Sequence, residues 1–143
     1  ISLPDAIDGL RATDVYPGRA EVVRYFMYRY EEHLAHKAGQ NLNESQWNRI
    51  WADEPAKSIE HIKPQSSGVS YIHHLGNLTM LPPGTNSKLK DTDPTNKVST
   101  YEMCGLIGSA DVARAIKKAA WSAKSVQERE ADLLKWAQSA WKD

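Results

Sequence analysis

The sequence predicts an α+β domain that is mainly helical, with one strand–loop–strand–helix unit over about residues 57–92 embedded among the helices. Apolar residues recur at helical spacing on both sides of this unit, whereas inside it they form short runs of β-compatible residues. A chain of 143 residues also buries roughly 70% of its unfolded surface, which is enough for a real core. We therefore expect one domain over residues 1–143.

Amphipathic periodicity predicts four helices. They are expected over residues 20–37, 45–52, 110–123 and 125–141. In the second helix, the spacing places Trp47, Ile50 and Trp51 on the buried side. Ser125, followed three residues later by Glu128, forms a capping-box pattern that would begin the last helix. These helices supply most of the expected core.

Two short strands are expected between the helical regions. Residues 58–62 and 75–81 are apolar and β-compatible, and a loop that contains Gly and Ser separates them. This pattern indicates a hairpin-like pair. Prolines and a glycine follow the second strand, and Thr85 or Asn86 would then cap a short helix that Asp91 and Pro94 terminate.

Composition restricts the class of protein. The 41% hydrophobic and 25% charged residues are typical of a packed globule and not of a disordered or membrane protein. No apolar run approaches the ~18 residues of a transmembrane helix and no signal segment is visible, so the cytoplasm is the expected location. Because the sequence begins at Ile1 and not at Met, we also expect a domain of a longer protein.

Charge and cysteine usage narrow the possible sites. Cys104 is the single cysteine, which excludes an internal disulfide and a CxxC zinc site, and we expect it to be buried and inert. The 18 basic and 18 acidic residues cancel, so the net charge gives no support to nucleic-acid binding. Any metal site must therefore use His, Asn or carboxylate ligands.

The stretch SIEHIKPQS, at residues 58–66, places an acid and a histidine at the end of a predicted strand. Neighbouring residues of a strand point to opposite faces, so Glu60 and His61 would diverge unless the strand ends beside them. Pro64 makes such an end expected, because it cannot donate to a β-ladder and holds the preceding residue extended. Both side chains would then stand at a rim that a substrate can reach.

Asparagine residues accompany this pair. Asn77 lies in the second predicted strand, and Asn86 follows nine residues later. An asparagine oxygen and the carboxylate of Glu60 are hard ligands of the kind that Mg²⁺ prefers. His61 would remain free to act as a base, since the unperturbed pKa of imidazole is about 6.5. The pattern therefore predicts a divalent-metal site beside a general base.

These residues resemble the HNH motif of ββα-metal (His-Me finger) nucleases over residues 58–90. EHIKP, NLTML and Asn86 are similar to that motif in residue type, order and spacing. Over residues 20–141, the chain resembles more narrowly the C-terminal nuclease domain of GmrSD-type modification-dependent restriction enzymes. The similarity includes YRYE at residues 28–31 and LGNLTML in the second strand. In the closing helix, the matching positions are Trp121, Val126, Arg129, Leu133 and Trp141.

The resemblance implies roles for individual residues. It implies that Glu60 and Asn86 bind one divalent metal ion, Mg²⁺ or Mn²⁺, and that His61 is the general base. Asn77 belongs to the catalytic set as the residue that ties the loop behind the histidine. The implied activity is hydrolysis of DNA phosphodiester bonds, as an endonuclease or a nickase. The chain would be the effector domain of a bacterial restriction or phage-defence system, and other domains of the parent protein would recognise the target.

Two departures from the HNH pattern qualify the resemblance. Glu60 stands where many HNH proteins have Asp, which lengthens the ligand arm by one methylene. The CxxC pairs that brace many HNH domains are absent from the sequence. Helices and tryptophans would have to hold the unit rigid instead.

Basic residues are concentrated near the predicted site. From Lys57 to Lys97 the sequence has a net charge of +2. The expected phosphate contacts are Lys63, Lys88, Lys90 and His74. Such contacts would position the DNA backbone without reading its sequence. His73 and His74 would either contact phosphate or assist the site, or else be ordinary exposed loop histidines.

Two other classes of function remain open. One is a non-catalytic nucleic-acid or partner-binding domain that keeps an HNH-like shape, and the other is a small metalloenzyme that acts on a different substrate. A binding module has no need of Glu60, His61 and Asn86 together, which favours the nuclease. The tryptophans are expected in the core and not as a platform for stacked bases.

Overall fold

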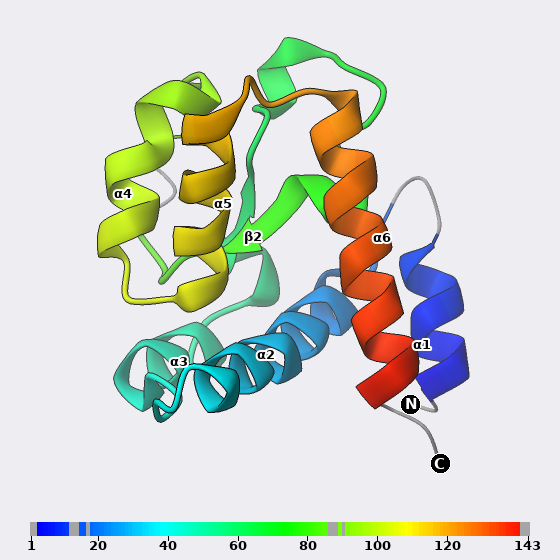
Figure 1. The fold of residues 1–143 in the computed structure, drawn as a ribbon, viewed down its shortest axis with the longest axis vertical. Helices are drawn as coiled ribbons and strands as arrows, with labels where there is room; N and C mark the ends of the chain where they lie inside the picture. The colour runs from blue at the N-terminus through cyan, green and yellow to red at the C-terminus, as the bar shows by residue number, and fades with distance from the viewer. Residues whose placement is uncertain (1–2, 12–14, 17, 86–88, 90, 141–143) are drawn as a thin grey trace.

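The computed structural model of the chain describes residues 3–11, 15–16, 18–85, 89 and 91–140 (Figure 1). Its α-helices are α1 (Leu3–Leu10), α2 (Ala20–Lys37), α3 (Glu44–Trp51), α4 (Val98–Met103), α5 (Ile107–Lys118) and α6 (Ala123–Ala140). Its strands are β1 (Ile59–His61) and β2 (Leu78–Met80). Short 3₁₀ helices are η1 (Pro55–Ser58), η2 (Gln65–Ser67), η3 (Leu75–Asn77) and η5 (Pro94–Lys97). The predicted α+β class, with mainly helical content, is confirmed.

The two strands form one antiparallel sheet among the helices (Figure 1). His61 pairs with Leu78, and a hydrogen bond of 2.9 Å from Ile62 N to Asn77 O extends the ladder beyond that pair. All the strand side chains are buried, and β2 contacts α2 and α5. β1 ends before Pro64, as the sequence predicts. The sheet therefore holds the EHIKP segment inside the molecule.

The second strand is shorter than predicted, because η3 takes its first residues. Helix α6 packs closely on this turn, and a Cβ at Gly76 would overlap the carbonyl oxygen of Val126. Arg129 Nη1 also donates to the carbonyl oxygens of Gly76 and Leu78, at 3.0 and 2.6 Å. Asn77 consequently lies directly before β2 and not within it.

The helix predicted after the second strand is not tested. Residues 83–85 form a turn, and Asn86, Lys88 and Lys90 lie outside the described residues. The next described elements are η5 and α4, which the periodicity does not predict. The described residues therefore include two antiparallel strands, and the helix that would complete a ββα unit is not assigned.

The flanking helices follow the prediction closely. Helix α2 has the predicted bounds, and α3 lies one residue earlier than expected at both ends. Helix α6 begins two residues earlier, and α5 begins three residues earlier and ends five residues earlier, at Lys118. The early start of α5 has a tertiary cause, because the Glu31 carboxylate on α2 accepts the N–H groups of Ile107 and Gly108 at 2.6 and 2.9 Å. A cap supplied by another helix leaves no local signal in the sequence.

Two local predictions are wrong. Trp51, expected on the buried side, lies at the end of α3 and is 39% exposed, with the Arg24 guanidinium carbon 4.6 Å from its ring centroid. The cap of α6 is formed one turn earlier than the predicted pair of Ser125 and Glu128. Ser122 precedes the helix, and its backbone N–H donates to Ser125 Oγ at 3.1 Å.

The core is one cluster of buried apolar residues from the helices and both strands. Phe26, Trp47 and Tyr101 are its largest fully buried apolar members, and burying such a side chain contributes about 1.5–3 kcal/mol. Cys104 is buried, as predicted. Among the helices in the described part of the chain, none is long and apolar enough to cross a lipid bilayer.

Candidate active site

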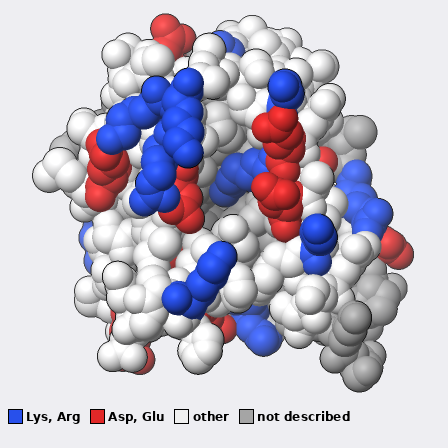
Figure 2. Space-filling view, in the orientation of Figure 1, with Lys and Arg blue, Asp and Glu red and all other residues white. Residues whose placement is uncertain are grey.

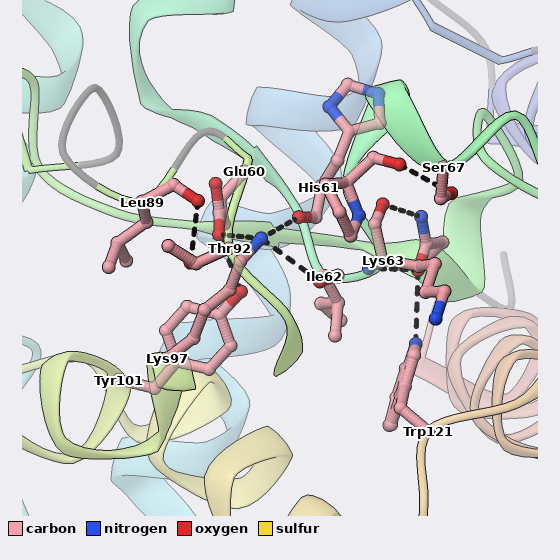
Figure 3. Close-up of polar contacts among 12 residues, drawn as sticks. Glu60, His61, Ile62, Lys63, Ser67, Leu89, Thr92, Lys97, Tyr101 and Trp121 are labelled. Carbon is pink, nitrogen blue, oxygen red and sulfur yellow. Dashed lines mark hydrogen bonds and ion pairs between the residues drawn. The ribbon is translucent and has the colours of Figure 1, made fainter. Parts of the chain in front are cut away.

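Strand β1 directs its two polar side chains, Glu60 and His61, into different surroundings. Figure 3 shows the His61 ring pointing away from the cluster formed by Glu60, Lys97 and Tyr101. The divergence follows from the alternation of side chains along a strand, since both residues lie within β1. The candidate site therefore consists of two polar clusters that share one short strand.

The first cluster is a buried ion pair between Glu60 and Lys97. Glu60 Oε2 lies 3.0 Å from Lys97 Nζ and accepts a hydrogen bond of 2.7 Å from the Tyr101 hydroxyl. Lys97 Nζ also donates to the carbonyl oxygens of His61 and Ile62, at 2.7 and 3.1 Å. An ammonium has three protons, so all of them find acceptors although Lys97 is 0% exposed.

Burial dominates the electrostatics of this cluster. It raises the pKa of Glu60 above its usual range, against the opposing effects of Lys97 and Tyr101. Burial and the neighbouring Glu60 raise the pKa of Tyr101 well above its ordinary value. The Tyr101 hydroxyl therefore stays protonated and remains a donor to the carboxylate. The cluster fixes the backbone at the end of β1.

The second cluster surrounds His61. Its Nε2 lies 3.2 Å from Nδ1 of His73, and the ring of Tyr16 meets the His61 ring edge-on with centroids 4.6 Å apart. His61 is 6% exposed, and burial lowers its pKa to about 4, with further contributions from His73 and Lys97. At neutral pH the imidazole is consequently uncharged, which is the form that accepts a proton.

Asn77 ties together the two ends of the loop that follows β1. Its Oδ1 accepts from the Lys63 N–H at 2.9 Å and from Trp121 Nε1 at 3.1 Å. Its Nδ2 donates to the carbonyl oxygens of Lys63 and Ile72, at 3.1 and 2.9 Å. Because Asn77 is fully buried and its amide is occupied by these bonds, its contribution is to position the backbone around His61.

The remaining predicted residues are placed as follows. Lys63 and His74 are half-buried, and the structure brings His73, not His74, to His61. Asn86, Lys88 and Lys90 lie outside the described residues. The described chain thus brings together His61 and Asn77 through their shared loop, and it places Glu60 in the neighbouring cluster.

Sequence reasoning missed Lys97, Tyr101 and Tyr16 as parts of the site. Lys97 and Tyr101 are four residues apart, a spacing that puts both on one side of a helical segment. A lysine at such a position is ordinarily read as solvated, so its burial carries no signal in the sequence. His73 and His74 are adjacent, and only the fold separates their roles.

The described residues fit a divalent cation in part. A carboxylate oxygen is a suitable ligand, and Glu60 Oε1 has no hydrogen-bond partner among the described residues. Its other oxygen already contacts the Lys97 ammonium, whose charge opposes a second cation nearby. Within the described ranges, no group of three or more His, Cys, Asp or Glu side chains could hold a metal ion. The fit therefore depends on Glu60 and on residues outside those ranges.

A cavity of about 380 Å³ opens between α5 and α6, and none of Glu60, His61 and His73 lines it. Figure 2 shows basic and acidic side chains on both sides of the hollow between these helices. Trp121 and Arg129, which line the cavity, hold Asn77 and η3 from behind. Residues that line the cavity therefore support the site, but the cavity does not contain the polar groups of the site.

Comparison with known proteins gives a family match. No curated protein and no solved structure matches the chain significantly. The family model described as GmrSD restriction endonucleases, C-terminal domain, matches residues 2–136. This range includes both polar clusters and confirms the family that the motifs resemble. The chain therefore belongs to the family of GmrSD restriction endonuclease C-terminal domains.

Proposed function

We propose that the chain, as a single domain, is a metal-dependent DNA endonuclease or nickase of the HNH type. It would be the effector domain of a bacterial restriction or phage-defence system. Family membership supports a restriction-endonuclease-type nuclease domain. The observation that carries the proposal further is the neutral, buried imidazole of His61 at the end of β1, behind which Asn77 ties the loop.

In this proposal, His61 takes a proton from a water molecule while the water oxygen attacks the phosphorus of a DNA phosphodiester. Asn77 holds the backbone on both sides of the loop, so that the imidazole keeps its position. Glu60, through Oε1, and Asn86 would hold Mg²⁺ or Mn²⁺. When bound, the ion would supply stabilisation of the charge on the phosphate and on the leaving 3′ oxygen.

DNA would be held mainly through its phosphates. Lys63, Lys88, Lys90 and His74 are the proposed contacts, and they would position the duplex without selecting a sequence. Because the chain has a formal net charge of zero, we expect weak binding that depends strongly on salt. Target choice would then come from other domains of the parent protein.

Plasmid nicking by the His61→Ala protein tests this proposal. Loss of a well-placed general base should lower the nicking rate in Mg²⁺ or Mn²⁺ by about 10²- to 10⁴-fold. His36→Ala is the matched control, because His36 is an exposed residue near the end of α2 and should leave the rate unchanged. Equal nicking rates of the His61→Ala and native proteins would contradict the assignment of His61 as the general base of a nuclease.

One observation favours a second candidate, a non-catalytic nucleic-acid or partner-binding domain. The Lys97 ammonium already contacts the carboxylate that the nuclease needs for its metal ion. A binding domain would bind DNA or a partner without cutting DNA in Mg²⁺ or Mn²⁺. Titration calorimetry of Mn²⁺ into the native and Glu60→Gln proteins separates the nuclease from the binding domain. The nuclease requires that the native protein bind Mn²⁺ and that the Glu60→Gln protein not bind it, whereas the binding domain requires neither result.

A further inference from the structure

We propose that His73 is a positioning residue for His61. Nδ1 of His73 accepts the hydrogen bond of His61 Nε2–H, which leaves Nδ1 of His61 as the nitrogen that takes the proton from water. The second half of this statement rests on the proposed nuclease function. The direction of the hydrogen bond is inferred from the same function, whereas the contact between the two rings is independent of it, and both can be measured separately.

The contact between the two rings requires one donor and one acceptor. His61 Nε2 and His73 Nδ1 are 3.2 Å apart, and the ring planes are inclined by 79°. A neutral imidazole carries one N–H and one lone pair, so one ring donates and the other accepts. If His73 donated, the lone pair of His61 would be occupied and the ring would have no nitrogen left to act as a base.

The surroundings of His61 are compatible with the direction in which it donates. Among the described residues, His61 Nδ1 has no hydrogen-bond partner. This nitrogen is also not completely buried. His61 Nδ1 therefore retains contact with solvent, where a water molecule can approach its lone pair. His73 is half-buried, so water can satisfy its remaining Nε2–H. Both rings then have every polar group satisfied.

Backbone hydrogen bonds and an aromatic ring hold His73 in position. Its carbonyl oxygen accepts from Val15 N–H at 3.0 Å, and the preceding carbonyl, that of Ile72, accepts from Asn77 Nδ2 at 2.9 Å. The Tyr16 ring stacks on His73 with centroids 5.5 Å apart and meets His61 edge-on. The two imidazoles are therefore held against one aromatic wall, which fixes their relative orientation.

The proton transfer requires no reactant other than water and the DNA phosphodiester. The O–H bond of water breaks as an N–H bond forms at His61 Nδ1. The water oxygen bonds to phosphorus, the bond from phosphorus to the 3′ oxygen breaks, and the departing 3′ oxygen takes a proton from solvent water. The resulting imidazolium keeps its Nε2–H bonded to His73 Nδ1. His73 thus performs two tasks, since it selects the tautomer of His61 and provides an acceptor for the charged form.

Nitrogen NMR of the imidazoles tests the hydrogen bond directly. Long-range ¹H–¹⁵N spectra of the labelled protein should show His61 protonated on Nε2 and unprotonated on Nδ1, with the signals assigned from the His61→Ala protein. In His73→Phe the acceptor is lost, so His61 should populate both tautomers. In His73→Asn the amide oxygen can accept the same bond, so the native tautomer should return.

Nicking kinetics test the consequence for catalysis. The His73→Phe protein should lose about 10- to 100-fold in kcat with KM unchanged, and His73→Asn should recover most of that loss. His36→Phe is the matched control, because His36 is an exposed residue near the end of α2 and its replacement should keep the native His61 tautomer and kcat.

Two results would overturn the proposal: a native His61 that carries its proton on Nδ1, or a His73→Phe protein with the native His61 spectrum. If His73→Phe does not fold, the native spectrum and the His73→Asn protein decide the matter. If the native tautomer is as expected but the native protein never cuts DNA, the proposed function fails while the positioning of His61 by His73 stands.

Discussion

Lys97 carries its charge into the interior at the point where β1 ends. The cost of removing an ammonium from water is offset there by one carboxylate and two backbone carbonyl oxygens within 3.1 Å. The same contacts hold the carbonyl groups of His61 and Ile62, so the ion pair controls the backbone from which the His61 side chain projects. Stability and the geometry of the candidate base therefore depend on the same cation.

Replacing Lys97 with Met should destabilise the fold strongly. The substitution leaves the Glu60 carboxylate buried without its partner, and breaking a buried pair in this way costs about 3–5 kcal/mol. Urea unfolding measures this cost. The double variant Lys97→Met/Glu60→Gln should recover part of it, because a neutral amide can still accept from the Tyr101 hydroxyl.

The matched control for this prediction is Lys117→Met. Lys117 Nζ lies 2.7 Å from Glu102, but both side chains are well exposed. Such a surface pair contributes about 0–1 kcal/mol. Similar losses in Lys97→Met and Lys117→Met would show that the interior ion pair does not have the strength assigned to it.

At the scale of elements, the helices hold one another by contacts between distant parts of the chain. Glu31 on α2 caps α5, and Arg129 on α6 holds the carbonyl groups of η3 and β2. The Glu31 side chain is buried, and burial raises its pKa although its two backbone hydrogen bonds oppose this. Its capping role should therefore depend on pH.

Replacing Glu31 with Ala should cost about 1–2 kcal/mol, because two N–H groups of α5 lose their acceptor. A folded-state pKa above the usual 4.5 means that the native state holds the proton more tightly than the unfolded state. The contribution of Glu31 is therefore fully present below pH 4.5 and is lost as the pH rises through the folded-state pKa. Urea unfolding at several pH values should give a larger cost at pH ~4 than at pH ~7. The opposite slope would mean that the capping bonds outweigh burial.

The contact between η3 and α6 should tolerate no side chain at residue 76. Gly76→Ala would push α6 away from η3, at a cost of about 1–3 kcal/mol in unfolding experiments. It should also reduce nicking, because Asn77 is the next residue. Gly18→Ala is the control, since a Cβ there meets nothing within 4 Å and the change should stay within about 0.5 kcal/mol. A native-like Gly76→Ala protein would contradict the close packing.

For the whole molecule, zero net charge makes local basic residues decisive for DNA binding. If Lys63 contacts phosphate, Lys63→Ala should reduce the slope of log affinity against log salt by about 1, equally for unrelated DNA sequences. Fluorescence anisotropy with a short duplex measures this slope. Lys37→Ala, at the exposed end of α2, should not change it. An unchanged slope in Lys63→Ala would remove Lys63 from the interface.

Much of the architecture could be predicted because it depends on local periodicity. The spacing of apolar residues gave the bounds of α2, and the short β-compatible runs located β1 and β2. The spacing of apolar residues did not predict the bounds of an element where a contact with a distant element sets them. Gly76 forms part of η3 because α6 packs on it, and α5 begins early because Glu31 lies on α2.

The candidate site could be predicted only where a residue type has few roles. EHIKP and Asn77 stand out in the sequence, and Asn77 does tie the loop beside His61. Lys97 could not be found, because a buried lysine looks like a solvated one until its acceptors are known. The choice between His73 and His74 depends on the path of the loop, which their adjacent positions do not reveal.

The dispersed origin of the two polar clusters limits how this site can be transplanted. Tyr16 comes from the segment before α2, Lys97 from the segment after the sheet, and Trp121 from the approach to α6. A graft of residues 57–92 onto another scaffold would carry His61 and Asn77 and lose these three supports. An engineer who wants a portable version would have to redesign the surrounding packing first.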